Sequence, residues 1–491
     1  MSDLSHIAIV FVIYAIIILT IAFIGKYITK NLSDYILAGR RLSGPITALG
    51  AGASDMSSWL TMALPGFIYV YGLSMIWMPI ALIIGAWSNW IFIAKRLRIY
   101  TELTNDALTL PSYFYHRFQD HKKILRLVTS IASVIFFTCY AAAGFMSGAI
   151  LLQIIFGIEY IPGLIISSTT IILYTAIGGF LALNWIDFFQ GSLMFVALLI
   201  VPIVTANHLG GIEIATMITK KLYPQHVAIL NNITVLGVTS CLAWGLGYFG
   251  QPHINIRFMA IRSVNELPVA RNICMIWMIF SLLGAIGTGF FGAAFYGKEI
   301  LPQPETVFIM LSKQLFNPWM TGILLSAVLA SIMNTVSAQI LMTTSIIAED
   351  IVYATWKHKF SDQKYLFVTK IIMIFVAMIA IKIAINPKTI LHAVGFAWSG
   401  LGAAFGPTIL CSLYWRRMNL PAAISGVIVG MLTVITMQPW LNHSDILPGF
   451  VILPGFLFST AAIFIVGYLT KAPSQKIVEK FDIMLSKIKK I

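Results

Sequence analysis

The sequence predicts an all-α integral membrane protein with about 13 transmembrane helices. Hydrophobic residues make up 59% of the 491 residues and charged residues 10%, and the mean hydropathy is +0.88. A soluble domain carries about a quarter charged residues, and the strands of an outer-membrane barrel give alternating segments of only ~10 residues. Apolar segments of roughly 20 residues, the length of a helix that crosses a bilayer, instead recur along the whole chain.

The predicted spans follow one another with short polar connections, so no soluble domain is expected. No Lys or Arg precedes the first span and no small-residue cleavage site follows it, so we expect a retained helix and not a signal peptide. The tail has the lysine spacing of an amphipathic segment on anionic lipid, and a solvated tail is the alternative. The spans are expected at about 6–25, 44–64, 68–94, 127–155, 160–182, 188–208, 232–256, 272–296, 318–347, 366–385, 391–414, 420–438 and 449–470.

The positions of the basic residues predict the orientation of the chain. Its net charge is +14. Positive residues are retained on the cytoplasmic side during membrane insertion, so we expect the N-terminus outside, the C-terminus in the cytoplasm and a multi-pass protein of the cell (inner) membrane. Topology therefore explains the charge without a nucleic-acid partner. The clusters expected inside are 26–41, 95–126, 257–271, 357–370, 416–417 and 471–490.

Catalysis is not expected, because the spans hold no nucleophile–base pair and no cluster of metal ligands. His253 and His392 lie at span edges without partnered ligand spacing, and we interpret them as structural. We predict no enzyme activity, no catalytic residues, no bound organic cofactor and no obligate protein partner. The cysteines share no close spacing and are expected to be buried packing residues: Cys139, Cys241, Cys274 and Cys411.

One carboxylate, Asp55, lies well inside a predicted span. A charge near the bilayer centre costs about 2.5–3.5 kcal/mol on insertion scales and usually persists for a function. Small and hydroxyl residues surround Asp55 from 51 to 59 and favour a local departure from helix, which membrane proteins tolerate where the backbone lines a cavity. The alternative is a packing face of small residues whose Asp pairs with a Lys.

A second break is predicted at 244–253, where three glycines and a proline interrupt the seventh span. The glycine spacing formally matches a dinucleotide fingerprint, but no βαβ unit surrounds it. Transporters with inverted repeats place their sites where corresponding broken helices meet. Because five spans separate the two breaks, we expect repeats at 44–208 and 209–414. The remaining segments are a first helix and inner loop at 1–43, two peripheral helices at 415–470 and a basic cytoplasmic tail at 471–491.

A third polar cluster, from Ser331 to Ser337 in the ninth span, offers the hard oxygen ligands that sodium prefers. Hydroxyls that bond back to their own helix are the alternative. Asp187 follows at the inner end of the fifth span, where a solvated loop acid and an ion-entry residue are both open interpretations.

The chain resembles the sodium/solute symporter family, and within it the members that carry proline. The resemblance extends through nearly the whole chain, and its strength lies in the joint order and spacing of the motifs. Besides the two breaks, the segments that carry it are 34–40, 107–111, 178–182, 316–319 and 402–407.

This resemblance implies a five-plus-five inverted-repeat core, one sodium ion and one substrate moved by alternating access. It also implies residue roles. Carried onto this sequence, sodium is bound by the carbonyls of Ala53, Met56 and Ser331 and by the side chain of Thr335, with Asn334 beside them. Ion coupling involves Asp55, Ser57 and Asp187. The residues implied on the substrate side are Trp59, Ala63, Tyr140, Trp244, Tyr248 and Gln251.

Three positions depart from the family pattern. Asn334 stands where the family has a serine hydroxyl, which leaves ion selectivity open, although an amide oxygen still coordinates. Ser331 replaces an alanine, and Ala63 replaces a glycine near the substrate side. The expected function is sodium-coupled uptake of L-proline. A sodium- or proton-coupled symporter of another small amino acid or carboxylate, and a membrane sensor that binds solute without moving it, are the alternatives.

Overall fold

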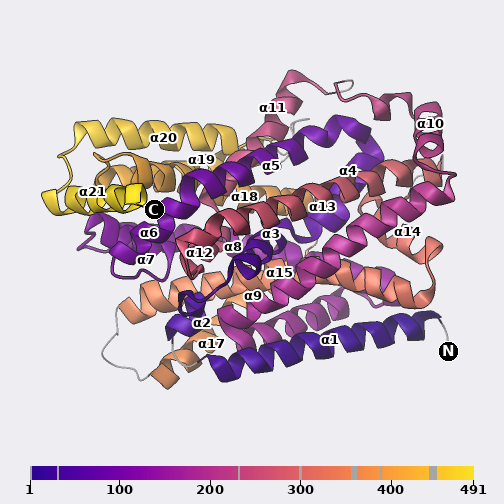
Figure 1. Ribbon diagram of the computed structural model, residues 1–491, viewed down its shortest axis with the longest axis horizontal. Coiled ribbons are helices and arrows are strands. Elements are labelled where there is room, and N and C mark those ends of the chain that lie inside the picture. The colour runs from indigo at the N-terminus through magenta and orange to yellow at the C-terminus, as the bar shows by residue number, and fades with distance from the viewer. Residues whose placement is uncertain are drawn as a thin grey trace.

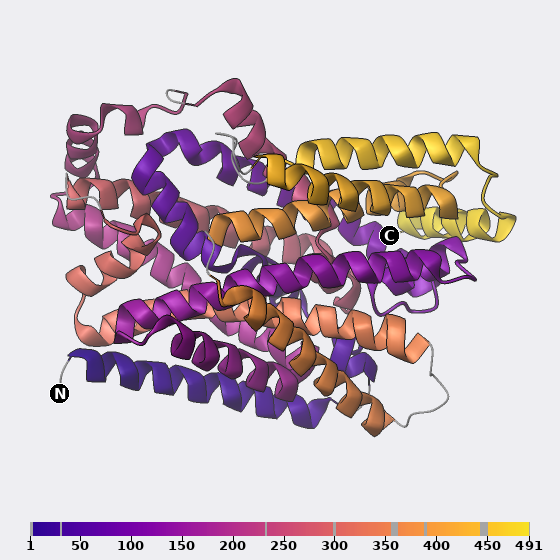
Figure 2. The same ribbon diagram turned by 180° about the vertical axis from the view of Figure 1, so that it is seen from behind.

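The computed structural model describes residues 3–29, 32–230, 233–297, 301–354, 362–386, 390–441 and 450–490. Over these ranges the regular elements are helices (Figures 1 and 2), and strand pairing is limited to one isolated bridge between Leu42 and Ile261. Within the same ranges, ten helical segments are long and apolar enough to cross a membrane. The predicted all-α membrane class is therefore confirmed.

Ten segments correspond to thirteen predicted spans because some spans run together. The 60-residue stretch Gly44–Leu103 covers two predicted spans, and so does the 49-residue helix α9, Tyr160–His208. The seventh predicted span is divided, and its apolar part, Val235–Gly250, is shorter than the others. The count of thirteen remains a prediction.

Helix α9 folds back on itself at Gly179, whose φ of 65° and ψ of −174° are not helical. In a straight helix, Tyr174 and Gln190 would lie about 24 Å apart at 1.5 Å per residue. However, the Tyr174 hydroxyl donates to the Met333 carbonyl at 2.7 Å, and the Gln190 amide donates to the Tyr14 hydroxyl at 2.6 Å. Since Tyr14 itself contacts the Met333 sulfur at 3.7 Å, both halves of α9 meet one point of the core.

The centre of the bundle is α15, Pro318–Ile346, which is buried on all sides from Ser331 to Ile346. A helix that is apolar or small all round lies inside a bundle. It packs against α1, α3, α8 and α9, while α1 lies at one edge of the molecule (Figure 1). The main helices are α1 Asp3–Ile28, α3 Gly44–Ser58, α8 Ile124–Phe156, α13 Leu267–Tyr296, α17 Asp362–Ala384 and α18 Ile390–Tyr414.

The remaining helices connect or flank these. They are α2 Leu32–Leu37, α4 Leu64–Tyr71, α5 Trp77–Asn89, α6 Lys95–Leu103, α7 Leu110–Phe118, α10 Ile212–Leu222, α11 Val235–Ala243, α12 Pro252–Ala260, α14 Val307–Leu315, α19 Leu420–Leu441, α20 Ile452–Leu469 and α21 Gln475–Lys490. Four short segments depart from α-helical geometry. They are the π-helical segments η2 Trp59–Ala63, η4 Trp90–Ala94 and η9 Ile347–Tyr353, and the 3₁₀ segment η6 Trp244–Gly250.

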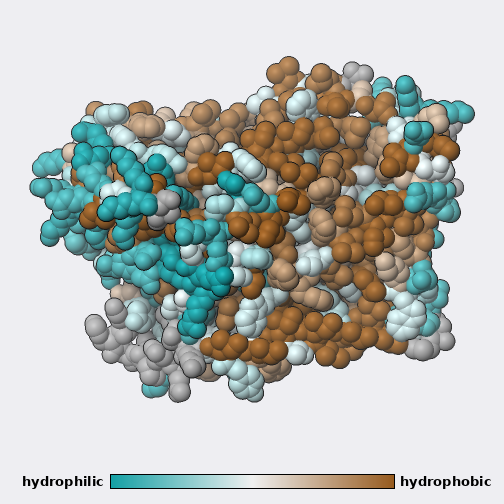
Figure 3. All heavy atoms as spheres, in the orientation of Figure 1, coloured by the Kyte–Doolittle hydropathy of each residue, from teal (hydrophilic) through white to brown (hydrophobic). Residues whose placement is uncertain are grey.

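The surface is divided into an apolar middle and a polar end. Figure 3 shows hydrophobic residues over the middle of the visible face and hydrophilic residues gathered over α6, α7 and α21 at one end. An apolar belt is what a bilayer requires of the helices that face it. Of the lysines predicted on the cytoplasmic side, Lys30, Lys357 and Lys359 lie outside the described residues.

The C-terminal segment packs on protein, which differs from both interpretations of the tail. Helix α21 buries Ile477, Phe481 and Met484 and packs against α6. The Phe481 ring lies 6.3 Å from the Tyr100 ring, and the Arg117 guanidinium lies 5.4 Å from the Phe481 ring centre. Helix α6 therefore packs against the face of α21 that the sequence analysis assigned to lipid, and the Arg117 guanidinium of α7 lies over Phe481.

An exposed ion pair fixes α21 laterally. Arg416 donates from two nitrogens to the two carboxylate oxygens of Asp482, at 2.9 and 2.6 Å. The hydrogen bond from Arg416 holds the pKa of Asp482 below its usual value. Because the pair is exposed, it orients the helix, and the buried face provides most of the binding.

We expect Phe481→Ala to release α21 without unfolding the bundle. Removing a buried phenylalanine ring costs about 3 kcal/mol, so proteolytic cleavage within the tail of the solubilised protein should become about two orders of magnitude faster. Ile483→Ala is the matched control, because the Ile483 side chain is 47% exposed. Equal cleavage rates in the two variants would show that α21 is not held by its apolar face.

Candidate functional site

The two predicted breaks lie face to face in the core. Helix α3 departs from helical geometry at Ser57, with φ 47° and ψ −168°, and the Ser57 hydroxyl accepts a hydrogen bond of 3.1 Å from the backbone N–H of Trp59. The second departure is η6, where the chain is a 3₁₀ helix between α11 and α12. The Trp59 and Trp244 rings stack at a centroid distance of 6.4 Å and an angle of 28°. A positive φ at a non-glycine residue is strained and is often found at functional sites.

A small cavity lies between the breaks. Three tryptophans and one carboxylate define its character, since an aromatic wall with a single acid suits a small ligand that is apolar on one side and cationic on the other. Of the six residues predicted on the substrate side, Trp59, Tyr140 and Trp244 line it. The full lining is Asp55, Met56, Trp59, Leu82, Tyr140, Trp244, Val394 and Trp398.

The other predicted substrate residues stand behind this lining. The Tyr248 hydroxyl donates to Asp55 Oδ2, and its ring meets the Trp398 ring edge-on at 5.2 Å. The Gln251 amide donates to the carbonyls of Gly247 at 3.3 Å and Trp398 at 3.2 Å. Ala63 is buried in η2. None of these three residues belongs to the described lining of the cavity.

Asp55 is 6% exposed and has one satisfied oxygen. Its Oδ1 lies 3.9 Å from His253 Nε2 and accepts no hydrogen bond from the described residues. Over the same residues no lysine pairs with Asp55, so the packing alternative of an Asp–Lys pair is not observed. An acid with one orphaned buried oxygen beside a cavity fits a bound cation.

A second small cavity lies where the α3 break meets α15. Ser57, Ser58 and Thr335 line it together, and the hydroxyls of Thr61 and Ser331 form a hydrogen bond of 2.7 Å between the two elements. The structure therefore brings the predicted third polar cluster to the first break. Gln339, which sequence reasoning missed, also lines this cavity, and neither atom of its amide has a hydrogen-bond partner among the described residues.

Some polar groups of this cluster form hydrogen bonds within α15. Thr335 donates to the Ser331 carbonyl at 3.3 Å and to Asn334 Oδ1 at 3.1 Å, while the Asn334 amide contacts the sulfur of Met194 at 3.5 Å. The long Thr335–Ser331 contact leaves both oxygens weakly engaged. On α3, Met56 lines the first cavity, and Ala53 is buried against α9.

Asp187 is not a solvated loop acid. It lies within α9 and is fully buried, and its Oδ2 accepts a hydrogen bond of 2.7 Å from Arg257, which is itself 1% exposed. Arg257 also donates to the carbonyl of His253, the residue beside Asp55. Asp55 is therefore not the only acid inside the core, and His253 and Arg257 lie between it and Asp187.

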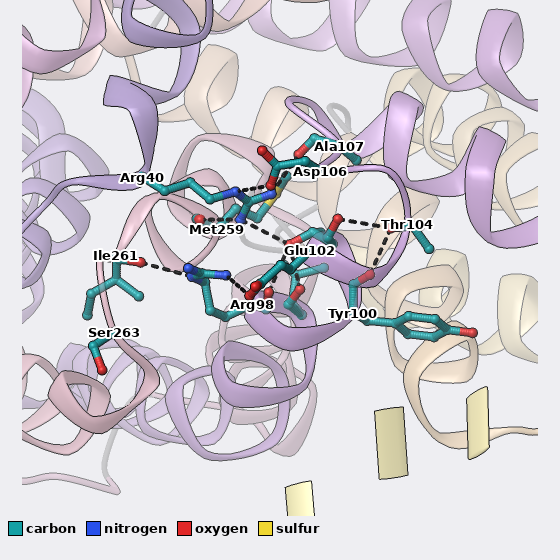
Figure 4. Close-up of polar contacts among 12 residues, drawn as sticks. Arg40, Arg98, Tyr100, Glu102, Thr104, Asp106, Ala107, Met259, Ile261 and Ser263 are labelled. Carbon is teal, nitrogen blue, oxygen red and sulfur yellow. Dashed lines mark hydrogen bonds and ion pairs between the residues drawn. The ribbon is translucent and has the colours of Figure 1, made fainter. Parts of the chain in front are cut away.

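Two arginines fix the C-terminal end of helix α12 (Figure 4). Arg40 donates to the Met259 carbonyl at 2.6 Å and pairs with Asp106 at 2.6 Å. Arg98 donates to the Ile261 carbonyl at 2.9 Å. Since these arginines come from the start of the chain and from α6, three segments are tied together at that end.

The fold and these cavities are typical of a membrane transporter. The model of the sodium:solute symporter family matches residues 35–430. The chain belongs to this family, so it is a transporter and not an enzyme, and sodium is its coupling ion.

Named relatives match nearly the full length. The high-affinity proline transporter PutP of Bacillus subtilis (strain 168) is 45% identical over 459 residues, covering 92% of this chain and 96% of the relative. The sodium/proline symporter of Escherichia coli (strain K12) is 43% identical over 480 residues, covering 96% and 94%.

Solved structures share the fold. A Na⁺-coupled sialic acid symporter in its substrate-bound outward-open state matches with a TM-score of 0.80 at 17% identity, over 96% of this chain and 99% of that one. The nucleobase-cation-symport-1 family transporter Mhp1, in a closed conformation, matches with a TM-score of 0.57 at 12% identity, over 92% and 99%.

We expect Asp187→Ala to destabilise the protein by about 3–5 kcal/mol, because it leaves the buried Arg257 without its partner. The double variant Asp187→Leu with Arg257→Met should recover most of that loss, since it removes both charges. Thermal unfolding of the solubilised protein measures both. The control is Glu102→Ala, which removes the 57% exposed partner of Arg98 and should cost less than about 1 kcal/mol. A cost no larger than that of the control would show that Arg257 is not dependent on Asp187.

Proposed function

We propose that this chain takes up L-proline together with sodium by alternating access. The observation that carries the proposal is the cavity between the two breaks, with aromatic walls and Asp55 at one side. Family membership supplies the sodium coupling, and the relatives that match nearly the whole chain are named proline transporters. Uptake of labelled proline into vesicles, with sodium and proton gradients imposed separately, tests it.

In this proposal the substrate contacts Trp59, Tyr140 and Trp244. Their faces pack the pyrrolidine ring, and a secondary ammonium gains a cation–π contact with an indole. Tyr248 holds the Asp55 carboxylate in place through its hydroxyl. Gln251 and Ala63 support the cavity without contacting the substrate. Gln251 fixes η6 to α18, and Ala63 adds a methyl group to the packing of η2.

Sodium is proposed at the junction of α3 and α15. The ligands are the carbonyls of Ala53, Met56 and Ser331 together with the Thr335 hydroxyl and the Asn334 amide oxygen. The hydrogen bond between Thr61 and Ser331 and the shared cavity of Ser57 and Thr335 support this position. Asp55 supplies the negative field, Ser57 sets the path of the break, and Asp187 acts through Arg257 and His253.

The repeats are proposed at 44–208 and 209–414, with 1–43 and 415–470 peripheral and 471–491 as the tail. The N-terminus is placed outside and the C-terminus in the cytoplasm of the cell (inner) membrane. The gathering of hydrophilic residues over α6, α7 and α21 supports this orientation, since basic loops stay inside.

One sodium ion per proline is energetically sufficient. Moving one positive charge inward gains roughly 2.3 kcal/mol per 100 mV, and a tenfold sodium gradient adds about 1.4 kcal/mol. The sum of roughly 3.7 kcal/mol supports a solute ratio of about 500-fold.

Asp55→Asn should abolish sodium-driven proline uptake, because the amide lacks the charge that stabilises the cation. Initial rates in vesicles at equal membrane content measure this. Asp482→Asn, which removes an exposed acid of the tail, should leave uptake near the parent rate. Normal transport by Asp55→Asn would contradict its role, and parent uptake that ignores sodium but follows a proton gradient would contradict sodium coupling.

Asn334→Ser should preserve or increase sodium affinity, because a hydroxyl is a compact hard-oxygen ligand. The sodium concentration that gives half-maximal proline uptake measures this. Ser326→Ala is the control, since the Ser326 hydroxyl bonds to its own helix at the Gly322 carbonyl. Complete loss of uptake in Asn334→Ser would show that the amide is specifically required.

A further inference from the structure

We propose that Trp398 is a specificity-determining residue that sets the largest ring the substrate cavity accepts. The inference rests on the proposed function, because it assigns the size limit of the same site. Trp398 lies on α18, outside both breaks, and its side chain is only 3% exposed. Together with Val394, four residues earlier on the same helix face, it forms the α18 side of the cavity.

The indole of Trp398 completes a row of three rings. The Trp244 ring stacks on the Trp59 ring at 28° and on the Trp398 ring at 22°, with centroid distances of 6.4 Å in both pairs. Tyr248 meets the Trp398 ring edge-on at 83°. A substrate ring in the cavity therefore meets a continuous aromatic surface to which two breaks and α18 each contribute one tryptophan.

Hydrogen bonds hold this wall rigid. The Trp398 indole N–H donates to the Trp244 carbonyl at 2.9 Å, and the Trp398 carbonyl accepts from the Gln251 amide at 3.2 Å. If the side chain swung away, the Trp398 indole N–H would lose this partner inside the protein, which costs the desolvation of that group. A larger substrate cannot displace the wall cheaply.

The chain also leaves space for this indole. A Cβ atom added at Gly247 would lie 2.0 Å from Trp398 Nε1 and 2.3 Å from its Cε2. Any side chain at Gly247 would therefore clash with the Trp398 indole and displace it. The break and the α18 tryptophan are therefore complementary in shape.

A rigid wall discriminates by size. One extra methylene in a closely fitting apolar pocket changes selectivity by about 10- to 200-fold. Pipecolate, the six-membered-ring homologue of proline, carries one such methylene. Removing part of the Trp398 wall should therefore favour pipecolate relative to proline.

The experiment compares Trp398→Leu and Trp398→Phe with the parent in membrane vesicles. The readout is the ratio of the concentrations of unlabelled pipecolate and unlabelled proline that halve labelled proline uptake. This ratio is independent of how much folded protein each vesicle holds, so a loss of expression does not imitate the effect. Phe396→Leu is the matched control, because Phe396 lies on another face of α18, packs on Phe136 at 5.4 Å and lines a separate cavity.

We expect Trp398→Leu to lower the ratio by about tenfold or more, Trp398→Phe to lower it less because an aromatic wall remains, and Phe396→Leu to leave it unchanged. An unchanged ratio in both Trp398 variants that still carry proline overturns the inference and leaves the proposed function standing. If uptake is too weak in Trp398→Leu, the ratio in Trp398→Phe decides. Absence of proline uptake in the parent overturns both.

Discussion

The hydrocarbon core of a bilayer offers no water, so every backbone N–H and C=O at that depth needs a partner inside the protein. The breaks at Ser57 and in η6 meet this constraint with side chains. The Ser57 hydroxyl accepts from the Trp59 N–H, the Gln251 amide donates to the Gly247 carbonyl, and the Trp398 indole donates to the Trp244 carbonyl. The same residues surround the cavity, so the site exists where the backbone could be released from its helices at low cost.

Charge inside the bundle obeys the same rule. Arg257 donates to Asp187 and to the His253 carbonyl and not to Asp55. Asp55 therefore accepts a hydrogen bond from Tyr248 alone, and its other oxygen has no donor among the described residues. An arginine closer to Asp55 would neutralise it and remove its attraction for a cation. Because His253 lies between the two acids, Asp187 stays paired with Arg257 while Asp55 stays available to a cation.

Much of this could be predicted from the sequence, because the breaks have local signatures. Small residues around Asp55 and the glycines after Trp244 indicated where the helices end, and the rings next to them line the cavity. Trp398 was missed because it stands in an otherwise regular apolar helix, where a single large residue has no periodic signal, and Gln339 was missed because it lies two residues beyond the polar cluster that ends at Ser337. The burial of Asp187 was also missed, since its partner Arg257 is seventy residues away. The docking of α21 was missed for the same reason: amphipathicity predicts an apolar face but not what covers it.

The bonds between η6 and α18 limit how the transporter can move. Alternating access requires the walls of the cavity to part on one side and then on the other. However, Gln251 and Trp398 bind η6 to α18 through two hydrogen bonds, and Gly247 allows the closest approach between them. Separating these two elements would break both hydrogen bonds inside the protein at once, and each broken bond costs the desolvation of its buried polar groups. Movements of the transporter should therefore keep η6 and α18 together, so that the aromatic wall that limits substrate size moves as one body.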